Sequence, residues 1–216
     1  MTTRPRGRPR AFDEGIVLDR ALDAFWGAGY EATSLDDLAA ATGLARASIY
    51  AAFSDKQSLY LKTLDRFSDR MRRQFQDSFA GGKQLVDVLT DFYLKAIALY
   101  FSGDHPRGCL VMCTAASPAG SHPHIREALL TTMQATEKAF IAAFSRAQSN
   151  EGTSLYADPS IRAELAAAAL QSIALRARAG ESRKLLENFA REAAAFLCDV
   201  HLGGGGSSAR KRETRG

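Results

Sequence analysis

Helical periodicity constrains this chain more than any other feature of its sequence. Between Phe12 and Leu202, apolar residues recur at intervals of three and four, alanine and leucine are abundant, and runs of β-branched residues are absent. These are the properties of amphipathic α-helices, and no stretch alternates convincingly as a half-buried strand would. The six prolines fall where glycine, serine, histidine or aspartate already marks a break, so the helices between them can be long. We therefore expect an all-α protein.

The first helices are bounded by recognisable capping residues. Asp13 is expected to cap a helix that ends near Gly29, and Ser34 to cap the next, which has acidic residues in its first turn. Gly43 ends this second helix after two turns, and a third short helix follows over residues 46–53. Two short helices joined by a glycine turn are typical of a helix-turn-helix.

The segment Leu35–Ser54 has suitable residues at three positions that a helix-turn-helix requires. Ala39 is small enough for the second helix to cross closely, Gly43 supplies the turn backbone, and Ile49 anchors the second helix in the core. In such a motif the start of the second helix meets base edges in the major groove. The segment therefore predicts a DNA-reading element.

Polar residues in and beside this motif are candidates for DNA contact. Arg46 and Ser48 are placed for bases or phosphates, and arginine is the commonest reader of guanine. Simple capping is the alternative for Thr33 and Ser34, and a packed aromatic ring is the alternative for Tyr50. The full set of candidates is Thr33, Ser34, Arg46, Ser48, Tyr50 and Lys56.

Both ends of the chain are basic. Arg6, Arg8 and Arg10 precede any acidic residue, and the stretch Arg6–Pro9 resembles an AT-hook, whose arginines lie along a narrow minor groove. A solvated tail that only aids solubility is the alternative.

Four parts are expected: a basic arm (1–11), a helix-turn-helix domain (12–56), a larger helical domain for ligand binding and dimerisation (57–202), and a flexible basic tail (203–216).

The larger domain is expected to begin with a long helix from Lys56 to the glycines at 81 and 82. Alanine-rich helices near its end permit close packing, which suits a dimer face or an intramolecular core equally well. The later helices are predicted over residues 85–101, 109–116, 124–149, 161–179 and 182–202.

A sensor site is a further possibility in this domain. Cys109 and Cys113 share a face if their segment is helical, with histidines at 105, 122 and 124 nearby. They are candidates for a metal pair or, beside Arg107, for an exposed, acidified thiol at Cys109; a plain apolar core is the stronger alternative, and we expect no metal. The candidate ligand or sensor residues are Tyr93, Tyr100, Cys109, Met112, Cys113 and Phe140.

Several classes of protein are disfavoured. Three cysteines form no disulfide framework, and no signal peptide or transmembrane run is recognisable, so we expect a cytoplasmic protein without a membrane partner. Common nucleophile, zinc and phosphate-binding motifs are missing, so we expect neither an enzyme nor a cofactor.

The N-terminal pattern resembles the TetR family of regulators. The match covers roughly residues 12 to 64 and includes Phe25, Gly29-Tyr30, Ala32-Thr33-Ser34, Asp37-Leu38-Ala39, Gly43-Leu44, Ser48-Ile49-Tyr50, Phe53, Lys56 and Leu59. The resemblance implies a helical two-domain homodimer that binds a palindromic double-stranded operator and is released by a small-molecule effector. It also implies DNA contact for the six candidates above, although Ala45, Ala47 and Ala51 leave fewer side chains on this helix that can specify bases.

A repressor is the expected function, with a thiol-modifying signal at Cys109 as another trigger. A nonspecific architectural DNA binder and an activator are the alternatives.

Overall fold

The computed structural model describes residues 12–79, 82–151 and 158–199. Within these ranges the chain forms helices and no strand, which confirms the expected fold class. The predicted basic arm and tail lie outside the described residues. The elements are α1 (Glu14–Ala28), α2 (Leu35–Thr42), α3 (Arg46–Phe53), α4 (Lys56–Ser78), α5 (Leu85–Tyr100), α6 (Leu110–Thr114), the short 3-10 helix η1 (Pro118–Gly120), α7 (Pro123–Glu151), α8 (Pro159–Arg178) and α9 (Arg183–Leu197).

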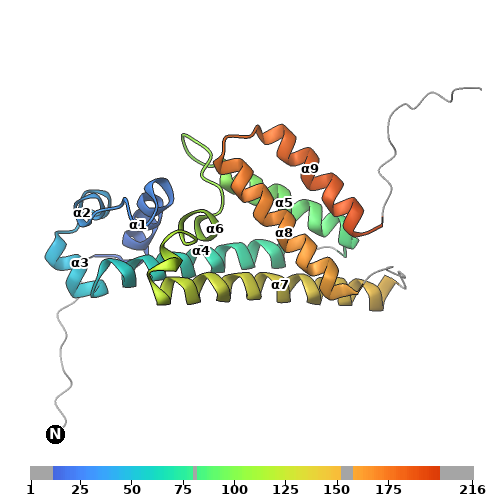
Figure 1. Ribbon diagram of the computed structural model, residues 1–216, viewed down its shortest axis with the longest axis horizontal. Coiled ribbons are helices and arrows are strands. Elements are labelled where there is room, and N and C mark those ends of the chain that lie inside the picture. Colours follow the sequence, from blue (N-terminus) through green and yellow to red (C-terminus); the bar gives the residue numbers. More distant parts are fainter. Residues whose placement is uncertain (1–11, 80–81, 152–157, 200–216) are drawn as a thin grey trace, which may run out of the picture.

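Helices α1, α2 and α3 form a small head at one end of the molecule (Figure 1). The Asp13 carboxylate accepts hydrogen bonds from the first turn of α1, and Gly29 ends that helix. Ser34 and Asp37 form a reciprocal capping box at the start of α2. Gly43 ends α2 with a φ of 74°, a left-handed conformation that glycine adopts readily. The expected ends of the first two helices are confirmed.

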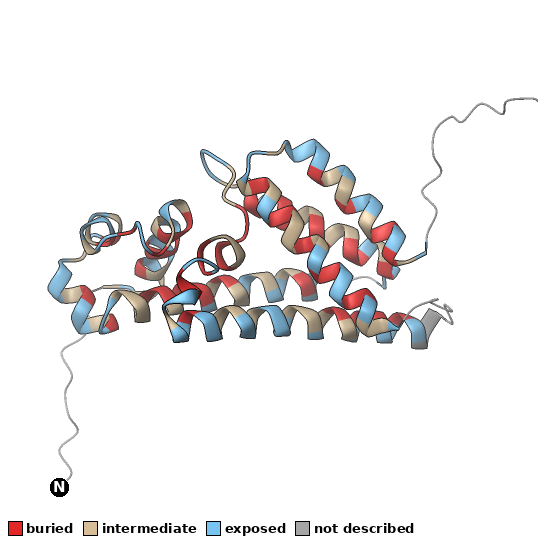
Figure 2. Cartoon of the chain, in the orientation of Figure 1, coloured by how far each residue is buried: buried red, intermediate tan, exposed pale blue. Residues whose placement is uncertain are grey.

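Helix α4 extends from the head through the body of the molecule. Its 23 residues span roughly 34 Å at the usual helical rise. Helix α7 lies alongside α4, while α5, α8 and α9 pack together over them (Figure 1). Figure 2 shows buried residues where the helices face one another. The rings of Phe75, Phe92 and Phe140 meet in this core, with centroids 4.9 to 6.0 Å apart.

The head is joined to the body around Trp26 of α1. Its indole N–H donates to the carbonyl of Gly108 at 2.9 Å, and the guanidinium of Arg107 lies 4.0 Å from the centre of its ring. Arg178 of α8 donates to the carbonyls of Trp26 and Arg107 at 3.1 and 3.2 Å. The segment that leads into α6 therefore contacts the head directly.

The helix predicted over residues 109–116 is shorter in the structure, where α6 covers Leu110–Thr114. Gly108 precedes it with a φ of 66°, and a Cβ at this position would collide with the carbonyl of Ala174. This close approach to α8 fixes the path of the chain before α6. No helix in the described ranges is long and apolar enough to cross a bilayer.

Candidate nucleic-acid interface and body cavity

Helix α3 presents polar side chains outward and is anchored by apolar ones. Ile49 and Phe53 are buried in the core, whereas Arg46 is exposed and Ser48 is half-buried. Tyr50 is 48% exposed as a residue, so the alternative that it packs in the core is wrong. The geometry suits a helix that carries a reading surface on a rigid support.

Arg46 is paired with Asp36 of α2 in this structure. Its Nε and Nη2 donate to the two carboxylate oxygens of Asp36, and both side chains are more than half exposed. Exposed ion pairs are weak because water screens them. The guanidinium is therefore available to a stronger acceptor. The sequence does not indicate this pairing, because Asp36 lies ten positions from Arg46 on a different helix.

Lys56 and Thr33 have structural partners where we predicted phosphate contacts. The Lys56 ammonium donates to the carbonyls of Tyr30 and Thr33 at 3.0 and 3.1 Å, and it lies 4.4 Å from the centre of the Tyr30 ring. The Thr33 side chain is buried, and its hydroxyl donates to the carbonyl of Gly29 at 2.6 Å. In this conformation both side chains hold the loop between α1 and α2, and phosphate contact by either stays a prediction.

Ser34 is exposed, but its hydroxyl belongs to the capping box. It accepts from the Asp37 backbone N–H at 3.1 Å and donates to the Asp37 carboxylate at 2.7 Å. Capping is therefore its role in this structure, and phosphate contact stays a prediction. The predicted arm contacts at Arg6, Arg8 and Arg10 lie outside the described residues.

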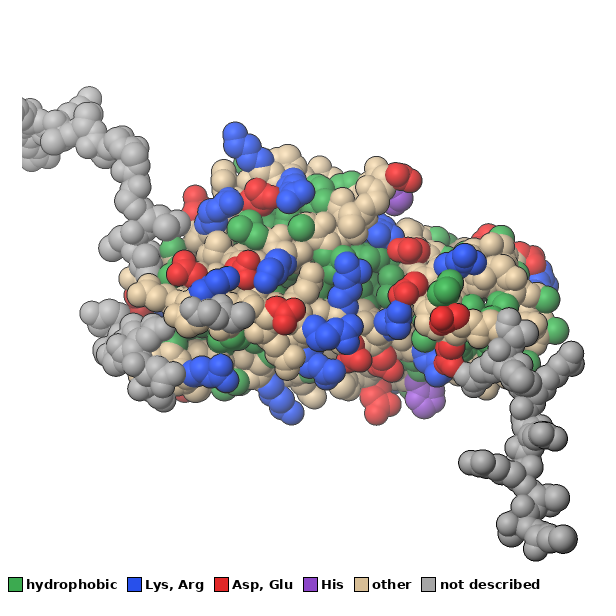
Figure 3. Space-filling model, turned by 180° about the vertical axis from the view of Figure 1, so that it is seen from behind, with side chains coloured by type: hydrophobic (Ala, Val, Ile, Leu, Met, Phe, Trp, Pro, Cys, Tyr) green, Lys and Arg blue, Asp and Glu red, His purple; other side chains and the backbone are tan. Residues whose placement is uncertain are grey.

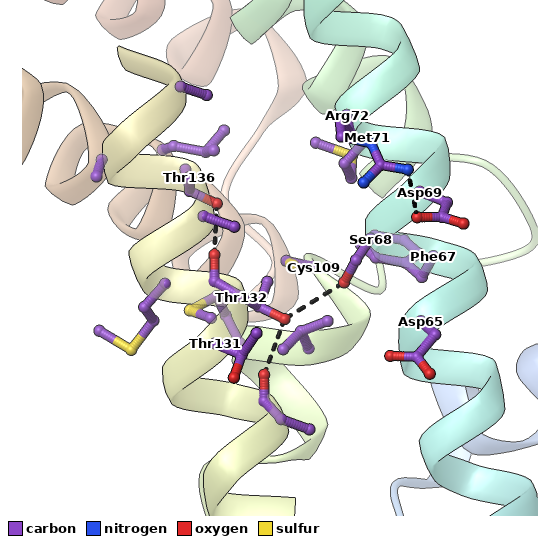
Figure 4. A pocket seen from close by; sticks show the side chains of 18 of the residues that line it. Asp65, Phe67, Ser68, Asp69, Met71, Arg72, Cys109, Thr131, Thr132 and Thr136 are labelled. Atoms are coloured by element: carbon purple, nitrogen blue, oxygen red, sulfur yellow. Dashed lines mark hydrogen bonds and ion pairs between the residues drawn. The ribbon is translucent and has the colours of Figure 1, made fainter. Parts of the chain in front are cut away.

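A cavity of about 780 Å³ opens between α4 and α7 and reaches α5, α6 and α8 (Figure 4). A volume of this size suits a small organic molecule. Of the six predicted ligand or sensor residues, four line it: Tyr100, Cys109, Met112 and Phe140. Tyr93 is not in its lining because its buried hydroxyl donates to the Ala166 carbonyl at 2.9 Å. Cys113 is also outside the lining, with its Sγ 3.7 Å from the carbonyl of Ala174.

The prediction of an exposed, acidified thiol at Cys109 is wrong. The side chain is buried, and burial raises the pKa of its thiol to about 12, because a thiolate there would lose its hydration. Burial also raises the pKa of the half-buried Cys113. Across the described residues, no three side chains from His, Cys, Asp and Glu gather in a way that could hold a metal ion.

Residues 17–63, from α1 into α4, match the family model described as bacterial regulatory proteins, tetR family. This stretch includes the whole of α2 and α3, with the Gly43 turn and the Ile49 anchor. The head of the chain is therefore a TetR-family DNA-binding domain.

Two relatives of this chain are transcriptional regulators by name. The HTH-type transcriptional repressor ComR of Escherichia coli (strain K12) is 40% identical over 116 residues, which is 52% of this chain and 55% of ComR. The uncharacterized HTH-type transcriptional regulator YezE of Bacillus subtilis (strain 168) is 24% identical, over 66% of this chain and 73% of YezE. The chain thus matches little more than half the length of ComR.

A solved TetR-family structure matches most of the described fold. It is a cysteine mutant of the transcriptional regulator CifR complexed with 26-base-pair double-strand operator DNA. It is 28% identical, covers 87% of this chain and 98% of its own, and superposes with a TM-score of 0.79. The likeness therefore extends through the body as well as the head.

The body also carries an exposed apolar surface on α8 and α9. Phe196 is 77% exposed, and it lines a shallow groove together with Leu165, small residues of α8 and part of α9. Hydrophobic side chains also reach the surface between charged ones in Figure 3. We refer to Ile161, Leu165, Leu175, Leu185 and Phe196 as the α8–α9 face.

Proposed function

We propose that this chain is a homodimeric, sequence-specific transcriptional repressor that leaves a palindromic operator when a small molecule occupies the body cavity. The observation that carries this proposal is the surface of α3, where Arg46 and Tyr50 project outward from a helix held by Ile49 and Phe53. The named function of ComR and the operator DNA bound to CifR support it.

Arg46 is proposed as the main reader of bases. It lies at the N-terminus of α3, the end of a recognition helix that meets base edges, and it exchanges Asp36 for guanine on binding. Ser48 and Tyr50 supply base or phosphate contacts, and the N-terminus of α2 at Ser34 offers backbone N–H groups to a phosphate. Lys56 and Thr33 contribute indirectly by fixing the loop before α2.

A second copy of the chain is proposed to pack on the α8–α9 face. Monomers seldom leave large apolar side chains this exposed in one region, and small residues beside them allow close helix packing. A twofold dimer would present two α3 helices to half-sites about one DNA turn apart, roughly 34–36 Å.

Release is proposed to follow a population shift between two head positions. Cys109 and Met112 line the cavity, and the adjacent Gly108 accepts the indole N–H of Trp26 in the head. A ligand that displaces α6 would therefore bias the position of α1. A ligand can shift this equilibrium only by its difference in affinity for the two states.

The test is to map genomic fragments bound by the full chain with and without excess competitor DNA at fixed salt. A repressor retains a preferred site, and Arg46→Ala reduces the ratio of operator to competitor affinity by about tenfold, the cost of one good base contact. Arg191→Ala, an exposed arginine of α9, is the matched control and retains the ratio. Uniform binding to all fragments would instead establish a nonspecific architectural binder and overturn the proposal.

The variant Asp36→Asn distinguishes base contacts made by Arg46 from a general effect of charge on DNA affinity. The change removes the competing carboxylate, so operator affinity rises in the parent protein. In the Arg46→Ala background its effect is smaller, because no guanidinium remains to be released.

A further inference from the structure

The cavity between α4 and α7 differs in chemistry along its length. At the far end from the head, its walls are aromatic, with Phe75, Phe92 and Phe140 in mutual edge contact. At the end nearer the head, carboxylates from two helices line it: Asp65 and Asp69 on α4, and Glu127 on α7. A ligand that fills the cavity therefore meets an apolar wall and an acidic wall.

The acidic end is poorly neutralised. Arg72 is the one lysine or arginine in the described cavity lining, and its guanidinium already donates to the Asp69 carboxylate at 2.9 Å. Asp65 has neither a hydrogen bond nor an ion pair within the parts of the chain that the structure describes. Glu127 lies at the solvent-exposed edge of the cavity, where it has only His124 within reach, at 3.9 Å, and that pair is ionic only when the imidazole is protonated. Lys62 acts on Asp65 from a distance but is itself paired with Glu14 at 3.4 Å. Within the described residues, neither Asp65 nor Glu127 therefore has a lysine or arginine within ion-pair distance.

Hydroxyl groups lie between the two ends. Figure 4 shows Ser68 on α4 and Thr132 on α7 pointing toward one another across the cavity, with their oxygens 3.4 Å apart. Thr131 and Thr136 extend this line of hydroxyls along α7. The order along the cavity is therefore carboxylate, hydroxyl and aromatic ring.

We propose that this cavity binds an elongated apolar molecule that ends in a positively charged amine. The apolar part lies against the phenylalanine rings, and the ammonium group lies between Asp65 and Glu127. Desolvation and the neighbouring Asp69 raise the pKa of Asp65 despite the opposing charge of Lys62, so a cation bound closer to this carboxylate would offset that cost. A carboxylate ligand would add to the unpaired negative charge, and a neutral ligand would leave it in place. This inference rests on the proposed function only in taking the cavity as the effector site.

The test uses three probes that share one naphthylbutyl body: the amine, the alcohol and the carboxylate. Binding to the full chain is measured by titration calorimetry without DNA. Two partly solvated ion pairs predict about tenfold tighter binding of naphthylbutylamine than of naphthylbutanol, with naphthylbutanoate weakest. Equal affinity for the amine and the alcohol would overturn the proposal.

Matched variants identify the groups that give this preference. The double variant Asp65→Asn, Glu127→Gln is expected to lose the preference for the amine while it binds the alcohol as before. Asp77→Asn, on α4 but outside the cavity lining, is expected to retain the preference. If the double variant still prefers the amine, the carboxylates are not the cation site and the proposal fails. The calorimetry is independent of operator binding, so a failure here leaves the DNA-binding proposal intact, and loss of operator binding leaves the ligand class intact.

Discussion

The reactivity of the Cys109 thiol is set by its burial and not by the charged residues near it in the sequence. Arg107 is close in sequence, but the Arg107 guanidinium lies over Trp26, and the Cys109 thiol lies among apolar side chains. With a pKa of about 12, the thiolate fraction near neutral pH is on the order of a thousandfold below that of an ordinary cysteine.

Cys109 is therefore expected to react with iodoacetamide at least a hundredfold more slowly at pH 8 in the native protein than after unfolding. Cys113, which is only half-buried, should be alkylated first of the two. Mass spectrometry of peptides from timed samples measures both rates. Labelling of Cys109 as fast as Cys113 would restore the thiol-sensing hypothesis.

Asp37 provides a pH-dependent contribution to the stability of the head. Hydrogen bonds from the Ser34 hydroxyl and backbone N–H lower the pKa of its carboxyl group. A lowered pKa means that the stabilisation is complete above the ordinary value near 3.8 and is lost as pH falls through the lowered one. Asp37→Asn should thus lower the unfolding midpoint at pH 7 and change it much less at pH 3. Asp104→Asn, in an exposed loop, serves as the control in the same thermal scans; a deficit at pH 3 equal to that at pH 7 would contradict the linkage.

The turn between α2 and α3 depends on the backbone of Gly43. A residue with a Cβ is strained at its φ of 74°, although the space around it is open apart from Arg20. Gly43→Ala should lower the free energy of unfolding by about 1 kcal/mol through this backbone cost. Gly27→Ala, in the helical backbone of α1 with open space around its Cβ position, should instead raise it by about 0.5–1 kcal/mol. Urea unfolding measures both; equal effects of the two changes would count against the left-handed turn.

The elements that sequence predicted well are those fixed by local interactions. The caps at Asp13 and Ser34 involve residues at most three positions away, so their signals are continuous in the sequence. Lys56 has partners 23 and 26 positions away, and the burial of Cys109 depends on helices distant in the chain. No spacing rule contains those contacts, so the sequence could not indicate the structural partners of Lys56 or the burial of Cys109.

At the scale of the whole molecule, the α8–α9 face is apolar surface that remains exposed when a single chain has folded. If a second copy covers it, Phe196→Glu places a charge in that interface and should convert a dimer of twice 23.4 kDa into a monomer. Ile16→Glu alters an apolar residue on α1 that is 52% exposed, and it should leave the dimer intact. Light scattering after size exclusion gives the mass of each, and an unchanged dimer for Phe196→Glu would place the interface elsewhere.

The contacts around Trp26 also make its fluorescence a probe of the junction between head and body. The chain has one tryptophan, and it lies where α1 meets Arg107, Gly108 and Arg178. A change in the distance of the cation from the ring, or in the hydrogen bond of the indole, alters the wavelength and intensity of its emission. Excitation at the red edge of protein absorbance therefore reports changes at the contact between head and body, without a label, while effector or operator is added.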